Sequence, residues 1–180
     1  MKLNRVAPKL DGTFVKPLPG FGDGGYGVAI QNAYDYAGIT TNYGQGNDIP
    51  ELDLEIKTWD QTKNGHISVA SSTKEKIIKC KGQDFLNKFQ KWNLHMHEGG
   101  VLKTVKKINF DSIHKEISNE LTQLAEQLAN GVHTPKTSHF ILEHTKRKSY
   151  KLRIISNKAH KLFGMADSAN QFNNMFTELQ

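Results

Sequence analysis

A short segment of this chain carries two carboxylates and a lysine whose spacing suits the hydrolysis of phosphodiester bonds. Residues 51–58 alternate between apolar and charged side chains, as expected for a strand, so Glu55 and Lys57 leave the same face of it. Asp48 precedes Glu55 by seven residues, across a turn that contains glycine and proline. We therefore expect the two carboxylates to converge beside the lysine.

Two carboxylates that converge on one point form an all-oxygen site, which suits Mg²⁺. A lysine beside them stabilises a hydroxide or the negative charge that develops on a phosphate. The pattern predicts Asp48 and Glu55 as metal ligands and Lys57 as the catalytic cation. Asp53 shares the face of Glu55 and is the alternative to Asp48 as first ligand. An alternating charged strand is also typical of a solvated sheet edge, which leaves a non-catalytic protein as the alternative.

Acidic and basic residues are concentrated in different regions of the chain, whose net charge is +6. Between Asp11 and Glu55 there are seven acids and one base, whereas between Lys136 and Lys161 there are eight bases and one acid. A chain with this distribution can hold a cation in its first region and a polyanion in its second.

The basic region contains a predicted hairpin, with a cationic turn and a strand that presents further bases on one face. We expect the turn to bind the phosphates of double-stranded DNA, and Arg153, on the stiffer strand, to be the better candidate for a base contact. The five predicted DNA-binding residues are Lys146, Arg147, Lys148, Lys151 and Arg153.

The elements that must position these residues follow from hydrophobic periodicity. Strand 51–58 is expected to form a hairpin with strand 66–71 through a polar turn. Asp111 is expected to cap the clearest helix and Gly131 to end it. The predicted helices are 24–38, a short one striped by Phe85, Phe89 and Trp92, 111–131 and 167–179, and the remaining predicted strands are 101–109, 138–144 and 149–156.

The order of these elements predicts one α/β or α+β unit over residues 1–180. Residues 1–23 are expected to form an N-terminal arm, and residues from about 132 to 180 to carry the basic hairpin and a terminal helix. The chain has no apolar run long enough for a membrane helix and a single cysteine, Cys80, so we expect a cytoplasmic protein. His95 and His97 lack a second ligand pair for zinc and are expected to be surface histidines.

The segment NDIPELDLEIKT (residues 47–58) resembles the active-site segment of the PD-(D/E)xK nucleases. It is closest to the branch that holds the MutH mismatch-repair nicking endonuclease and related type II restriction endonucleases. In that branch an Asp, an aliphatic or aromatic residue and Pro precede a short turn and a strand that ends in Glu, an aliphatic residue, Lys and Thr. The segment GGYGVAIQ (residues 24–31) is similar to the glycine-led first helix of the branch. The resemblance covers roughly residues 20–73.

The resemblance implies a restriction-endonuclease-like core, in which helices flank a mixed central sheet. It implies that Asp48, Glu55 and the carbonyl of Ile56 bind Mg²⁺, for which Mn²⁺ can substitute, and that Lys57 is catalytic. The first helix of the branch commonly contributes a glutamate, whereas the corresponding residue here is Gln31. Gln31 can bind a metal-bound water but cannot accept its proton, and Asp35 is the candidate substitute.

The resemblance and the residues together predict a Mg²⁺-dependent endonuclease that hydrolyses double-stranded DNA, most simply a type II restriction endonuclease. A repair or recombination nuclease of the same superfamily would carry the same core. The alternative of a different class is a basic, non-catalytic DNA-binding or accessory protein. A homodimer is compatible with either function.

Overall fold

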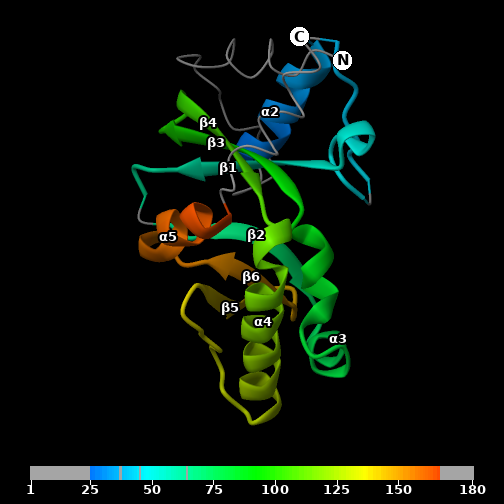
Figure 1. Ribbon diagram of the computed structural model, residues 1–180, viewed down its shortest axis with the longest axis vertical. Helices are drawn as coiled ribbons and strands as arrows, with labels where there is room; N and C mark the ends of the chain where they lie inside the picture. Colours follow the sequence, from blue (N-terminus) through cyan, green and yellow to red (C-terminus); the bar gives the residue numbers. More distant parts are fainter. Residues whose placement is uncertain (1–24, 37, 45, 64, 167–180) are drawn as a thin grey trace. The chain divides into compact units, whose positions relative to one another are not determined.

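The computed structural model describes residues 25–36, 38–44, 46–63 and 65–166, which divide into two compact units (Figure 1). Among these residues, the first unit comprises 25–63 and 90–109, and the second comprises 65–89 and 110–166. Each unit is therefore built from separate stretches of the chain.

The first unit is a mixed three-stranded sheet with one long helix packed against it. Strand β3 lies in the centre, pairs in parallel with β1 and antiparallel with β4, and sets Glu55 opposite Trp92. Tyr34 of the helix is fully buried against the sheet. The elements are α2 (Gly25–Tyr36), the 3₁₀ turn η2 (Pro50–Leu52), β1 (Leu54–Asp60), β3 (Lys91–Glu98) and β4 (Val101–Asn109).

The second unit is an antiparallel sheet in the order β2–β6–β5, covered by helices. The main helix, α4, buries an apolar stripe that includes Ile117, Leu121 and Leu124. The elements are β2 (Ile67–Ser72), α3 (Lys74–Lys79), η3 (Gln83–Lys88), η4 (Asp111–Ile113), α4 (His114–Ala129), β5 (Phe140–His144), β6 (Tyr150–Ile154) and α5 (Ser156–Ala166).

The α+β class is confirmed, but the single mixed central sheet is wrong, because the described strands form two separate sheets. Local periodicity located several elements well. The helices at 24–38 and 111–131 correspond to α2 and α4, and the strands at 101–109, 138–144 and 149–156 to β4, β5 and β6. Asp111 begins the turn η4 and does not cap α4, whose first residue follows Ile113.

The predicted hairpin between strands 51–58 and 66–71 is also wrong. β1 pairs with β3, and β2 pairs with β6 in the other unit. Directly after β1, the Gln61 N–H bonds the carbonyl of His97 near the end of β3, at 2.8 Å, so the chain is still bonded to β3 at this point. Trp92, expected on a helix, lies on β3 and is fully buried.

The sequence did not predict α3 or α5, which are short helices. The predicted arm at 1–23 and the predicted terminal helix at 167–179 lie outside the described residues. Within the described ranges, no helix is both long enough and apolar enough to cross a membrane.

Candidate metal-binding and catalytic site

A tight backbone turn brings Asp48 to Glu55. Ile49 and Leu54 form an isolated antiparallel bridge, in which each N–H bonds the carbonyl of the other, at 2.9 and 3.2 Å. The intervening residues form η2, which Asp53 closes in the left-handed region at φ 49°. Because Ile49 is paired with Leu54, the residues on either side of this bridge, Asp48 and Glu55, are neighbours.

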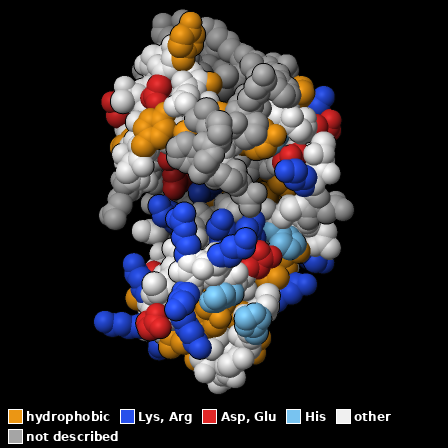
Figure 2. All heavy atoms as spheres, turned by 180° about the vertical axis from the view of Figure 1, so that it is seen from behind, with side chains coloured by type: hydrophobic (Ala, Val, Ile, Leu, Met, Phe, Trp, Pro, Cys, Tyr) orange, Lys and Arg blue, Asp and Glu red, His pale blue; other side chains and the backbone are white. Residues whose placement is uncertain are grey.

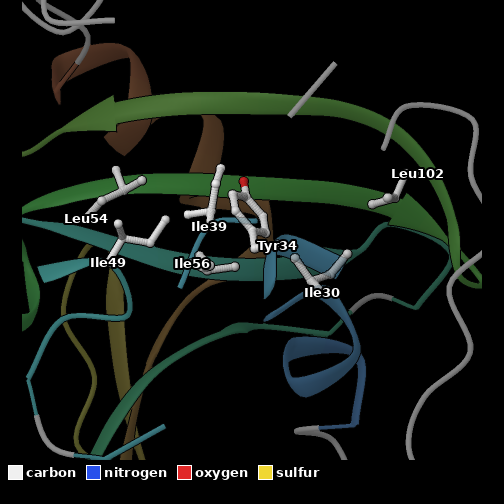
Figure 3. Close-up of a cluster of buried hydrophobic side chains, with 7 residues drawn as sticks. All are labelled: Ile30, Tyr34, Ile39, Ile49, Leu54, Ile56 and Leu102. Carbon is white, nitrogen blue, oxygen red and sulfur yellow. The ribbon is translucent and has the colours of Figure 1, made fainter. Parts of the chain in front are cut away.

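An apolar cluster holds this turn in place (Figure 3). Ile49 and Leu54 are fully buried, and Ile56 is almost fully buried. The residues of the cluster, from α2, the loop after it, the turn, β1 and β4, are Ile30, Tyr34, Ile39, Ile49, Leu54, Ile56 and Leu102. The burial of these side chains stabilises the conformation that the two carboxylates require.

Both carboxylates are held by backbone donors. The Asp48 N–H donates to Glu55 Oε2 at 3.2 Å, and the Ile56 N–H donates to Asp48 Oδ2 at 2.8 Å. The side-chain amide of Gln31 donates to Asp48 Oδ1 at 3.0 Å. Each Asp48 oxygen thus accepts one of these bonds.

The electrostatics of the pair favour a bound cation. Burial, followed by the charge of Glu55 and a side-chain hydrogen bond with it, raises the pKa of Asp48 to about 7, although the Ile56 N–H and Lys57 act in the opposite direction. When two neighbouring carboxylates are both ionised, nearby positive charge does not fully balance their negative charge. The residues therefore fit a divalent cation, which would supply the missing positive charge.

Glu55 is only 4% exposed, which does not fit the alternative of a solvated strand face. Lys57, two residues along, is half-buried, and its ammonium nitrogen lies 5.6 Å from the centre of the Trp92 ring. Its charge lowers the pKa of Asp48, so the lysine acts on the carboxylate pair. The structure thus brings together Asp48, Glu55 and Lys57.

The Ile56 carbonyl has a position suited to the same site. In an extended strand the N–H and C=O of one residue point to the same side. The Ile56 N–H points to Asp48, on the edge of β1 that faces away from β3, so its carbonyl shares that edge. The Ile56 side chain, in contrast, lies in the core.

Asp53, the alternative to Asp48, and Asp35, the alternative to Gln31, both lie outside the site. Asp53 is exposed in the turn, so the structure brings Asp48 rather than Asp53 to Glu55. Asp35 accepts hydrogen bonds from the Thr41 N–H at 2.7 Å and from its hydroxyl at 3.1 Å. Partial burial alone would raise the pKa of Asp35, but these bonds and one from Tyr43 lower it. Asp35 therefore fastens the loop after α2, and Gln31 contacts the site.

His95 and His97 are buried, so the expectation of surface histidines is wrong. His95 Nε2 lies 2.9 Å from the Tyr34 hydroxyl, which also accepts a bond from the Asn93 amide at 3.1 Å. Burial lowers the pKa of His95 to about 4, which keeps the ring neutral. In the part of the chain that the structure describes, no three His, Cys, Asp or Glu side chains gather into a metal site, and the candidate site offers the two carboxylates of Asp48 and Glu55.

This network was not predicted from the sequence, because no strand was predicted at the position of β3. The signal was present: Trp92, Leu94 and Met96 alternate with polar residues, as in a strand. The pattern did not reveal that the polar residues of this strand, Asn93, His95 and His97, are buried as well. Their burial is possible because they form hydrogen bonds within the unit.

The predicted DNA-binding residues lie in the second unit, whose described part holds 14 Lys and Arg against seven Asp and Glu. Seen from behind, Lys and Arg side chains gather over this unit (Figure 2). The hairpin turn is ordered by the Thr145 N–H, which bonds the Ser149 carbonyl at 2.8 Å. Its three bases, Lys146, Arg147 and Lys148, are exposed.

The two bases on β6 differ from those of the turn. Lys151 is half-buried, opposite Glu143 of β5. Arg153 pairs with Glu143 at 2.9 Å and donates to the Ser68 hydroxyl at 3.2 Å. The guanidinium of Arg153 thus binds residues of the two neighbouring strands, β5 and β2. The sequence had predicted a side chain that is available for a base contact.

Comparison with known proteins does not extend this description. No protein-family model, curated protein or solved structure matches the chain. The site rests on the geometry of its own residues.

Proposed function

We propose that this chain is a divalent-metal-dependent endonuclease that hydrolyses phosphodiester bonds of double-stranded DNA. The observation that carries the proposal is the convergence of Asp48 and Glu55 on one edge of β1, with the pKa of Asp48 raised to about 7. A pair with uncompensated negative charge, next to a lysine, meets the requirements of phosphoryl transfer with a metal ion.

In this proposal Asp48, Glu55 and the Ile56 carbonyl hold Mg²⁺ or Mn²⁺, which when bound polarises the scissile phosphate and a water molecule. Gln31 and the Ile56 N–H orient the Asp48 carboxylate through their hydrogen bonds. The Lys57 ammonium donates to the attacking water or to a phosphate oxygen and stabilises the charge that develops there. Hydrolysis consumes one water molecule for each bond cleaved.

Substrate binding is assigned to the exposed turn of the second unit. Lys146, Arg147 and Lys148 present three charges on an ordered loop, which suits contact with phosphates rather than with base edges. Lys151 adds a fourth charge on the adjacent strand. A type II restriction endonuclease is the most economical member of this class, and a repair or recombination nuclease would use the same residues.

Incubation of supercoiled plasmid and phage DNA with the purified protein tests the proposal. We expect cleavage with Mg²⁺ or Mn²⁺, none after chelation, and binding with little cleavage in Ca²⁺. Discrete fragments would indicate a restriction enzyme, and a smear a non-specific nuclease. DNA that is bound but stays intact with every metal would favour the accessory protein instead.

A further inference from the structure

One exposed aromatic side chain, Tyr43, is held in a fixed orientation beside the candidate site. The residue is 54% exposed. Its hydroxyl lies 2.6 Å from Asp35 Oδ2 and 2.7 Å from the Asn32 side-chain oxygen, both on α2. Tyr36, at the end of the same helix, is 96% exposed, and no hydrogen bond of its hydroxyl is described.

Tyr43 also follows directly after a residue that bonds the backbone of Asp48. The preceding residue, Asn42, donates its N–H to the Asp48 carbonyl at 2.8 Å. The carbonyl of Asn42 accepts a bond of 3.3 Å from the side-chain amide of Gln31, the same amide that donates to Asp48 Oδ1. Tyr43 is therefore one residue from the bond that closes the loop at Asp48.

The fold does not need the tyrosine to fasten this loop. Asp35 already accepts three hydrogen bonds from Thr41, one from its N–H and two from its hydroxyl, and these connect α2 to the loop. The additional bond from Tyr43 fixes the orientation of the ring, while the residue as a whole stays more than half exposed. An apolar ring that is both exposed and immobilised has little conformational entropy to lose when a flat ligand stacks on it.

We infer that the Tyr43 ring is a stacking platform for a nucleotide base next to the scissile phosphate. This inference rests on the proposed function, and it specifies the form of the substrate. Bases inside a duplex have both faces covered by their neighbours, so only a base that has left the stack can lie on the ring. The substrate is therefore DNA in which one nucleotide beside the cut is unpaired, either beforehand or through eversion by the protein.

The inference is tested by binding in Ca²⁺, with a duplex that contains a site cut in the plasmid assay. One version is fully paired, and the other has the nucleotide beside the cut placed opposite an abasic position. We expect the parent protein to prefer the unpaired version, and Tyr43→Leu to weaken that preference about tenfold, since stacking of one base contributes about 1–3 kcal/mol. Tyr43→Phe, which keeps the ring, should lose far less. The matched control is Tyr36→Leu, which removes an exposed ring from the same unit and should not alter the preference.

A fluorescent 2-aminopurine at the same nucleotide supplies a second measurement, because its emission is quenched when it stacks on an aromatic ring. We expect quenching with the parent and Tyr43→Phe, and bright emission with Tyr43→Leu. The inference is overturned if Tyr43→Leu keeps the parent's preference, or if it weakens both duplexes equally while lowering the melting temperature. Absence of DNA binding by the parent would overturn the proposed function, and this inference with it.

Discussion

Removal of the Asp48 charge should stabilise the metal-free protein at alkaline pH, although it removes a group from the candidate site. In the folded chain the pKa of Asp48 is raised to about 7 by burial and by Glu55, whereas an aspartate in an unfolded chain has a pKa of about 3.9. Between these values the folded chain keeps a proton that the unfolded chain has released. The free energy of unfolding therefore falls as the pH rises through this window.

The magnitude follows from the size of the shift. About three pKa units, at 1.36 kcal/mol each, correspond to about 4 kcal/mol of destabilisation above pH 7. Solvent reaches part of the Asp48 carboxyl group and screens the charge, so we take roughly half of this, about 2 kcal/mol. For a chain of this size that free energy corresponds to a difference in melting temperature of about 4–8 °C.

The substitution Asp48→Asn keeps the shape of the side chain and abolishes its charge. Asn keeps only one of the two acceptor oxygens, which adds an offset that does not depend on pH. On top of that offset, we expect the melting temperature of the variant to rise relative to the parent's by about 4–8 °C between pH 4, where the folded parent is protonated, and pH 8. The assay is thermal unfolding followed by circular dichroism from pH 4 to pH 8 in the presence of a chelator. Asp53→Asn, which removes an exposed charge from the same turn, is the matched control and should show no such divergence.

Addition of Mg²⁺ at pH 8 should stabilise the parent and not the Asp48→Asn variant, because a cation compensates the charge that opposes folding. An offset between Asp48→Asn and the parent that stays constant from pH 4 to pH 8 would refute the reasoning about charge repulsion. A parent that gains no stability from Mg²⁺ or Mn²⁺ would refute the metal site.

Three further outcomes are expected. Glu55→Gln should abolish metal-dependent stabilisation and cleavage without unfolding the protein, as measured by thermal unfolding and a plasmid assay. Lys57→Met keeps an apolar stem next to Trp92 and should lower the cleavage rate about 10²–10³-fold with DNA affinity retained; full activity would remove the lysine from the mechanism. Triple alanine substitution in the hairpin turn should flatten the dependence of log affinity on log salt by about 0.9 for each phosphate that the turn no longer neutralises. Equal flattening by a control triple on α3 would show that only net charge matters. The turn residues are Lys146, Arg147 and Lys148, and the control residues are Lys74, Lys76 and Lys79.

The candidate site could be predicted from sequence because its residues are close along the chain. Asp48, Glu55 and Lys57 lie within ten residues, and the intervening turn needs only a local bridge between Ile49 and Leu54. Local periodicity was equally sufficient for α2, α4 and the strands of the basic hairpin. In each of these cases the information is contained in one continuous segment.

Strand pairing could not be predicted in the same way. β1 ends at Asp60 and its partner β3 begins at Lys91, so their pairing depends on how distant segments are buried together. The turn after β1 was consistent with a hairpin, and only the tertiary structure placed β2 in a different sheet. The dependence of strand pairing on distant segments also explains why the described strands form two sheets where one was predicted.

The sequence by itself determined which residues are the candidates for chemistry, where most of the main helices and strands lie and that charge is divided along the chain. The tertiary structure decided the environment of those residues: Glu55 is buried, Gln31 bonds Asp48, and Arg153 pairs with Glu143. The physical reason is that side-chain type and spacing are local properties, whereas burial and pKa depend on all the groups that the fold brings together from other parts of the chain.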